Sequence, residues 1–333
     1  MKSKISLRIN QLFHNREVLL FLPIYFFLSL NNLILKLRMT SAWTDGTLAS
    51  NHNALLAFTH YNNEQSRLFQ FLIPEFIHRV FSLSIVSSYA FARLLFVFMA
   101  FIAFHFFLRK WFSTAESFAG VLILSGSLAI TFLVTDLQES APLLMLLFIL
   151  GLWALREKKD LIFCILLILG GGLTNETMLV MAAGYFFYRI PSLKLSDIIK
   201  TGYKTCLIAL PAFLIQGGIR YINLNQPHLG GAYHLPDNLN GIWNEIHNPP
   251  LAVFYGVYLY PFLIFSIFWI CAALGYSKSP RFLKSVFWLV PLFIAAHMVT
   301  GIIYESRQMI PLGYILIPMS MFFFFPKEIS QTN

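Results

Sequence analysis

The strongest constraint on the fold is a series of apolar stretches of roughly 20 residues, each bounded by charged side chains. Only 12% of the 333 residues are charged, against roughly 25% in a soluble domain, and 57% are hydrophobic. So little charge cannot coat a soluble protein of this length, which excludes a soluble enzyme and predicts an all-α, polytopic integral membrane protein. The apolar stretches define eight full-length spans: 18–35, 86–108, 117–134, 141–155, 205–219, 251–274, 285–303 and 308–325.

The segment 160–189 is apolar but is interrupted at residues 170–176 by the sequence Gly-Gly-Gly-Leu-Thr-Asn-Glu. It could form one tilted helix or two short ones. Basic residues precede and follow it, and positive loops prefer the cytoplasmic side, so charge favours a hairpin with both ends inside. Two helices of about 11 to 13 residues reach only roughly 16 to 20 Å, less than the roughly 30 Å hydrocarbon core. The hairpin tip should therefore lie at membrane depth, surrounded by protein or water.

With this hairpin, the chain has about ten membrane helices in a single transmembrane domain, 1–333, with both termini cytoplasmic. Seventeen of the 24 Lys and Arg residues then lie inside, while nine of the 15 acids lie outside. The net charge of +9 thus reflects cytoplasmic anchors in the inner (plasma) membrane, and no nucleic-acid partner is expected. Two long outer loops, 36–86 and 220–250, carry the acids, so a functional site should open outward.

The first outer loop ends in an amphipathic stretch, 67–84. Polar residues or breaks recur in it about every four residues, at Gln70, Pro74, Glu75, His78 and Ser82. This pattern predicts an interfacial helix on the outer leaflet, with Pro74 as a candidate break. An ordinary membrane anchor without a substrate role explains the pattern equally well.

Four outer carboxylates are candidate site residues. Asp45 follows the first span and could act as a general base if burial raises its pKa, although an Asp-Gly pair is also a common turn. Asp136 and Glu139 are three residues apart, a spacing that shares one helical face, or they are solvated loop acids. Glu176, at the hairpin tip, is costly in hydrocarbon unless paired and therefore indicates function, unless the tip reaches water.

Two arginines are candidate anion ligands. Arg93 lies within a span, where it binds a ligand or snorkels to the interface. Glu305 and Arg307 connect the last two spans, where they cap a turn or where Arg307 holds a lipid phosphate bidentately.

Metal binding is a weaker hypothesis. His52 and His60 are weak ligand candidates whose spacing matches no metal motif, so a divalent ion is the one cofactor that the sequence leaves open.

The order of these features resembles a known enzyme family. A first span is followed by an outer loop with an early acid (Asp45), an interfacial helix and a span carrying Tyr89-x3-Arg93. A short acidic loop, a helical pair with Leu-Thr-Asn-Glu-Thr at 173–177, and a late Glu305-x-Arg307-x3-Pro311 complete the pattern. Over most of the chain this arrangement resembles the polytopic GT-C glycosyltransferases, which include the protein O-mannosyltransferases and the lipid A aminoarabinose transferases.

The resemblance implies a membrane glycosyltransferase that moves a sugar from a polyprenyl-phosphate donor to an acceptor hydroxyl at the outer face. It implies Asp45 as the base, Glu139 or Asp136 as groups that orient substrate or a metal, and Glu176 in the cavity wall. By the same likeness Arg307, with Arg93 as a candidate helper, binds the lipid phosphate, and the acceptor is an unidentified glycan, lipid or protein. The chain departs from the family where Gly46, not a second acid, follows Asp45, and where no soluble domain is expected after the last span.

Two other functions fit the same pattern. A transporter or flippase of a lipid-linked or envelope component would use Glu176, Arg93 and His297 along its path. A noncatalytic subunit of an envelope-polysaccharide assembly would use the outer loops for docking.

The charge count makes the topology testable. We predict that a reporter fused after Asn333 reports a cytoplasmic location, because the short basic loops then all lie inside. Paired fusions of alkaline phosphatase and green fluorescent protein measure this. Alkaline phosphatase activity at that position, with a dark fluorescent fusion, would overturn the topology.

Overall fold

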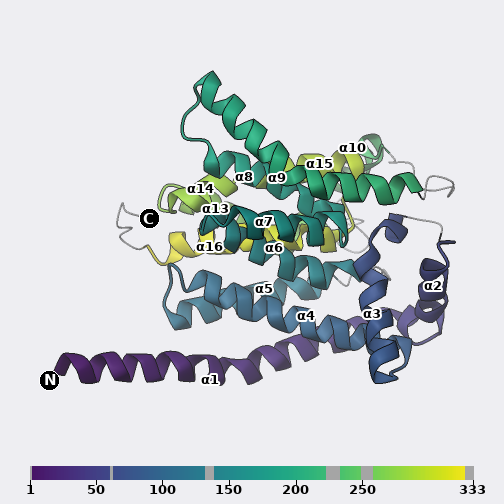
Figure 1. The fold of residues 1–333 in the computed structure, drawn as a ribbon, viewed down its shortest axis with the longest axis horizontal. Coiled ribbons are helices and arrows are strands. Elements are labelled where there is room, and N and C mark those ends of the chain that lie inside the picture. Colours follow the sequence, from purple (N-terminus) through teal and green to yellow (C-terminus); the bar gives the residue numbers. More distant parts are fainter. Residues whose placement is uncertain (1, 61–62, 132–138, 223–232, 249–257, 327–333) are drawn as a thin grey trace.

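The computed structural model describes residues 2–60, 63–131, 139–222, 233–248 and 258–326, and within these ranges every regular element is helical (Figure 1). The helices of the first half are α1 (Lys2–Met39), α2 (Thr47–Leu56), α3 (Leu68–Phe81), α4 (Ile85–Leu108), α5 (Thr114–Ile130), α6 (Ser140–Arg156) and α7 (Asp160–Leu167). Those of the second half are α8 (Met181–Arg189), α9 (Leu195–Ile222), α10 (Leu235–His247), α12 (Tyr260–Phe265), α13 (Phe268–Gly275), α14 (Arg281–Val286), α15 (Leu289–Thr300) and α16 (Gly313–Phe324).

Four helical stretches are long and apolar enough to cross a membrane: Leu20–Met39, Ile85–Leu108, Leu195–Ile222 and Arg281–Thr300. Three shorter apolar helices accompany them, Thr114–Ala129, Ser140–Arg156 and Asp160–Gly172. The all-helical fold is confirmed over the described residues, and these helices indicate a membrane protein.

Three expected spans differ in their backbone. The expected span 205–219 is part of the longer α9, which begins at Leu195. The described part of 251–274 is divided between α12 and α13 at Ser266, whose φ of 44° is left-handed and breaks the helical path. The last span begins as a 3-10 helix, Ser306–Leu312, before α16. Hydropathy reports apolar length but not these local changes in backbone conformation.

The central helix is α16, which is buried around its whole circumference. Ile315, Leu316, Ile317 and Met319 are all fully buried, and α16 packs most closely against α13. Gly275 at the end of α13 permits this approach, because a Cβ atom there would lie 2.0 Å from the Met319 carbonyl oxygen. A helix that is apolar on all sides belongs in the middle of a bundle.

By contrast, α9 runs along the outside of the bundle. Leu207, Leu210, Phe213 and Leu214 are each about half exposed or more. In a membrane protein such apolar side chains face lipid, so their exposure agrees with the composition.

The two ends of the bundle differ in their structure. The start of α1 and the end of α16 lie at one end, which we call the terminal end, and α2 and α3 lie at the opposite end, which we call the loop end (Figure 1). The amphipathic stretch 67–84 forms α3, which continues through Pro74 without a break and contacts α4 and α6. Its placement on an outer leaflet stays a prediction.

Candidate functional site

The hairpin 160–189 brings a polar tip into the protein interior at the loop end. After α7 a π-helical turn covers Ile168–Gly172, and a 3-10 helix, Glu176–Val180, leads into α8. Thr174 donates to the Leu169 carbonyl at 2.7 Å, while the Asn175 side chain accepts from the Thr177 backbone N–H at 3.0 Å and donates to Ser140 Oγ at 3.1 Å. Protein groups therefore satisfy the polar atoms of a tip that could not face lipid.

Glu176 is held by two arginines from distant parts of the chain. Arg67 donates to both carboxylate oxygens, Nε to Oε2 at 3.2 Å and Nη2 to Oε1 at 3.1 Å. Arg220, near the end of α9, donates to Oε1 at 2.9 Å. The carboxylate of Glu176 thus contacts two guanidinium groups, one of them bidentately. This pairing offsets the cost of an ionised side chain at the hairpin tip.

The burial of these three side chains is unequal. The Arg67 side chain is 6% exposed, whereas those of Glu176 and Arg220 are 28% and 32% exposed. Burial disfavours the charge of Arg67, but the charges of Glu176, Glu64 and Glu305 outweigh it and raise the pKa of Arg67 above its usual range. Arg220 is therefore the guanidinium that a ligand arriving from outside reaches first.

A second chain of polar contacts lies beside the first. Glu305 accepts a hydrogen bond from Arg307 at 3.2 Å and another from the Gln308 amide, whose oxygen faces His297 Nε2. His297 is buried in α15, and its Nδ1 lies 3.1 Å from the Phe293 carbonyl. Glu305 and Arg307 thus do more than cap a turn, because they connect the last loop to the interior of α15.

Glu139 forms a third polar group, which joins α1, α4 and the start of α6. It pairs with Arg93 Nη1 at 2.6 Å and with Lys36 Nζ at 3.3 Å, and all three side chains are less than 10% exposed. Arg93 Nε also donates to Asn32 Oδ1 at 3.1 Å. Arg93 therefore does not snorkel to the interface but binds a buried carboxylate.

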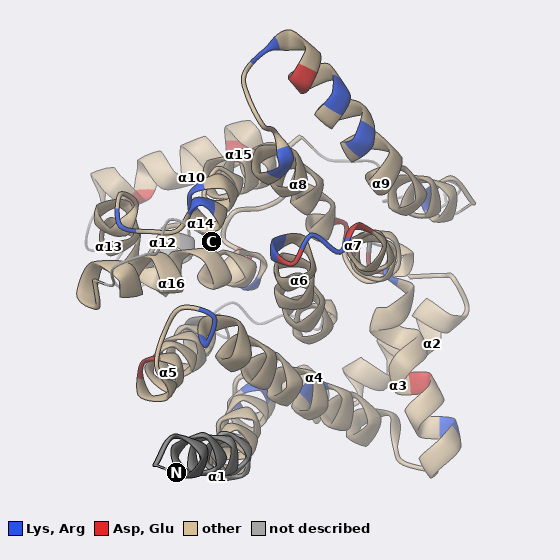
Figure 2. Cartoon of the chain, turned by 60° about the vertical axis from the view of Figure 1, so that its left-hand side comes forward, with Lys and Arg blue, Asp and Glu red and all other residues tan. Residues whose placement is uncertain are grey.

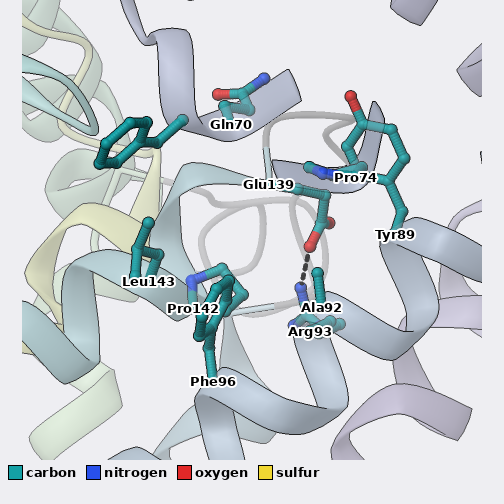
Figure 3. Close-up of a pocket in the computed structure, with 10 residues that line it drawn as sticks. Gln70, Pro74, Tyr89, Ala92, Arg93, Phe96, Glu139, Pro142 and Leu143 are labelled. Atoms are coloured by element: carbon teal, nitrogen blue, oxygen red, sulfur yellow. Dashed lines mark hydrogen bonds and ion pairs between the residues drawn. The ribbon is translucent and has the colours of Figure 1, made fainter. Parts of the chain in front are cut away.

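A small cavity adjoins this third group (Figure 3). Arg93, Glu139, Tyr89 and Gln70 line it, with the Glu139 carboxylate directed toward Arg93 (Figure 3). Its volume is about 10 Å³, which is room for about one water molecule. A sugar or phosphate cannot enter this cavity without movement of the surrounding side chains.

Asp45 lies apart from the buried groups. It is exposed in the turn before α2, where its Oδ1 accepts from the Thr47 backbone N–H at 2.9 Å. Hydrogen bonds from Thr47 lower the pKa of Asp45, so burial does not raise it toward neutrality as the base hypothesis had required. Asp136, the other predicted acid of the short loop, lies outside the described residues.

The histidines of the first loop are structural where their contacts are visible. His52 is buried between Tyr89 Oη, 3.1 Å from Nδ1, and Glu75 Oε2, 3.0 Å from Nε2. Because a carboxylate accepts, Nε2 donates and Nδ1 accepts from the tyrosine hydroxyl, which uses both ring nitrogens. Hydrogen bonds from His52 and Arg79 lower the pKa of Glu75 against a smaller cost of burial.

His60 is also buried, and in the described part of the chain no group of three or more His, Cys, Asp or Glu could hold a metal ion.

The sequence predicted the acids of this region better than their partners. Arg67, Arg220 and Lys36 are not among the candidate residues of the sequence analysis, yet each pairs with a predicted carboxylate. Each stands where a polar segment meets an apolar stretch, a position at which a basic residue commonly anchors a helix at the interface. That signal is too general to single them out.

Comparisons with protein-family models, with curated proteins and with solved structures find no match for this chain. The function is therefore argued from the site alone.

The buried pairing of Glu139 makes a prediction about stability. We expect Glu139→Gln to lower the free energy of unfolding by about 3 to 5 kcal/mol, because it leaves the charges of Arg93 and Lys36 buried without a carboxylate. Thermal unfolding of the purified protein in detergent measures the loss.

Glu157→Gln is the matched control. Glu157 also pairs with two bases, Lys110 and Arg156, but its side chain is 34% exposed, so the loss should stay below about 1 kcal/mol. Equal losses in the two variants would show that the buried carboxylate does not hold the three helices together.

Proposed function

We propose that this protein is a membrane glycosyltransferase of the GT-C type, with about ten membrane helices and both termini in the cytoplasm. It transfers a sugar from a polyprenyl-phosphate donor to an acceptor hydroxyl at the loop end, which faces outward across the plasma membrane. The arrangement of features in the sequence and the charged groups at the loop end support this assignment together.

The observation that carries the proposal is the convergence of arginines from separate segments on the loop end. Arg67 precedes α3, Arg220 lies near the end of α9 and Arg307 precedes α16, and each is bound to a glutamate. Bidentate guanidinium groups suit phosphate as well as carboxylate, so a polyprenyl phosphate can exchange for a glutamate oxygen on Arg220 or Arg307. The glutamates hold these cations in position before the donor arrives.

The reaction needs a base on one side and positive charge on the other. A carboxylate takes the proton of the acceptor hydroxyl, the hydroxyl oxygen attacks the anomeric carbon, and the bond from that carbon to the phosphate oxygen breaks. The polyprenyl phosphate leaves with the bonding electrons, and the arginines stabilise its developing charge.

Asp45 is the proposed base. Hydrogen bonds from Thr47 hold the pKa of this carboxylate below its usual range, so the assignment rests on its exposed position and not on a raised pKa. The exposed turn that carries it is accessible to an acceptor from outside the membrane. Glu176 holds Arg220 together with Arg67, Glu305 holds Arg307, and Glu139 with Arg93 joins the helices of the same end.

The base assignment predicts the effect of one substitution. Asp45→Asn should abolish turnover of lipid-linked sugar without lowering the amount of folded protein, because the amide cannot accept the proton. Release of polyprenyl phosphate from membranes that contain the overproduced protein measures turnover.

The control is Asp237→Asn, at another acid near the start of a helix, whose side chain is 73% exposed. It should retain activity. Full turnover in the Asp45 variant would remove Asp45 from the mechanism, and absence of any turnover in the wild-type protein would favour transport or a noncatalytic role.

The phosphate assignment makes a separate prediction. Arg220→Lys and Arg307→Lys should each weaken binding of a polyprenyl phosphate in nanodiscs by about tenfold, because an ammonium does not replace the bidentate fork. Quenching of intrinsic tryptophan fluorescence by a brominated polyprenyl phosphate follows binding.

Arg79→Lys serves as the control, since the Arg79 side chain is 75% exposed on α3 and pairs only with Glu75 among the described residues. Unchanged affinity in the Arg220 and Arg307 variants would mean that these arginines serve the structure alone.

A further inference from the structure

A cavity of about 250 Å³ lies at the terminal end of the bundle, between α8 and the first turns of α9. These turns project away from the other helices at the end where α1 begins (Figures 1 and 2). The cavity is smaller than the roughly 300 to 1,000 Å³ of sites for drug-sized ligands, so it suits a head group rather than a large molecule. It is separate from the charged groups at the loop end.

The acids that line the cavity already have partners. Asp160 forms an ion pair with Arg189 and accepts a hydrogen bond from the Tyr185 hydroxyl at 3.1 Å. Asp197 accepts one from Ser192 Oγ at 2.5 Å. Arg189 therefore neutralises Asp160, whereas Asp197, whose partner is an uncharged hydroxyl, keeps its negative charge at the cavity.

Two lysines at the mouth of the cavity have no such partner. Lys200 and Lys204 are exposed, line the cavity from one face of α9 and form no ion pair with any described residue. Like charges four residues apart on a helix repel each other, and an anion between them relieves the repulsion. Figure 2 shows basic residues on the projecting turns of α9.

Donors inside the cavity add to this charge. Arg189 lines the cavity, and its Nε atom is buried without a hydrogen-bond partner in the described structure. Thr201 is a buried lining residue that carries a hydroxyl group, whereas the hydroxyl of Tyr185 already donates to Asp160. Three bases against two acids leave a net charge of about +1, which matches the single negative charge of a phosphodiester.

The neighbouring face of α9 indicates where such an anion comes from. Leu195, Ile199 and Tyr203 recur every four residues and are 72%, 62% and 66% exposed. In a membrane this apolar face lies against lipid, directly beside the lysine face. A lipid can therefore place its chains on one face of α9 and its head group in the cavity.

We propose that the cavity between α8 and α9 binds the phosphate of an anionic phospholipid, with Lys200, Lys204 and Arg189 as its cationic ligands. This site does not depend on the proposed transferase function. The phospholipid anchors the projecting start of α9 to the bundle, because it contacts both helices that form the cavity.

The test uses the full-length protein in phosphatidylcholine nanodiscs, with and without phosphatidylglycerol. Native mass spectrometry after transfer to detergent counts the phosphatidylglycerol that the protein retains. Lys200→Gln/Lys204→Gln should lower its apparent affinity by at least about tenfold, and Lys200→Arg/Lys204→Arg should retain it, since the charge is preserved.

The matched control is Lys158→Gln/Lys159→Gln, which removes two exposed lysines from another loop and leaves the cavity intact. If this control retains as much phosphatidylglycerol as the wild type, the result supports the site. A loss equal to that of the Lys200/Lys204 variant would mean that general surface charge, and not the cavity, holds the lipid. A third arm adds inorganic phosphate to phosphatidylcholine nanodiscs. Stabilisation against heat by inorganic phosphate but not by phosphatidylglycerol would overturn the assignment to a lipid.

Discussion

A carboxylate between two buried cations is the interaction on which the loop end depends. Glu139 contacts Arg93 on α4 and Lys36 on α1, and it stands directly before α6. In hydrocarbon or a protein interior, each of these charges is costly alone, so the three helices are stable only when they meet in this register. Apolar packing in a bilayer does not fix the register of the helices in this way, because an apolar side chain has similar surroundings against lipid and against another helix.

Glu176 extends the same constraint to the other side of the bundle. It joins the hairpin tip to Arg67, before α3, and to Arg220 on α9. The Gln216 amide reinforces the joint when its oxygen faces Ser66 and Arg220 and its nitrogen faces the Gly172 carbonyl. The contacts that hold these side chains rigid for stability also hold them in position for the proposed binding of a phosphate.

The sequence predicted an all-helical membrane protein, which the described residues confirm, whereas four helices are long and apolar enough to span a membrane and the count of about ten stays a prediction. It also predicted a helix at 67–84 and a break near residues 170–176, because amphipathic spacing and a glycine run report directly on the backbone. It could not predict the turn at Ser266, which has no distinctive residue pattern. Nor could it pair Glu176 with Arg67, since the two are 109 residues apart and a single sequence holds no information about contacts at that distance.

Asp45 shows that residue type and chain position do not predict burial. Its residue type and place in the chain suggested a buried base, but the fold leaves it exposed with a lowered pKa. Position in the order of elements therefore predicted which acids lie at the loop end, while burial, which sets their chemistry, depended on packing that only the structure provides.

The two ends of the bundle use charge in different ways. At the loop end Arg67 and Arg220 share Glu176, and Arg93 shares Glu139 with Lys36, so each of these cations has a carboxylate partner. At the terminal end Lys200 and Lys204 remain exposed without an ion pair among the described residues. A paired cation contributes little to the attraction of an anionic membrane surface, whereas an exposed one contributes fully. The exposed lysines at the terminal end are therefore the cations that remain available for the proposed phospholipid site.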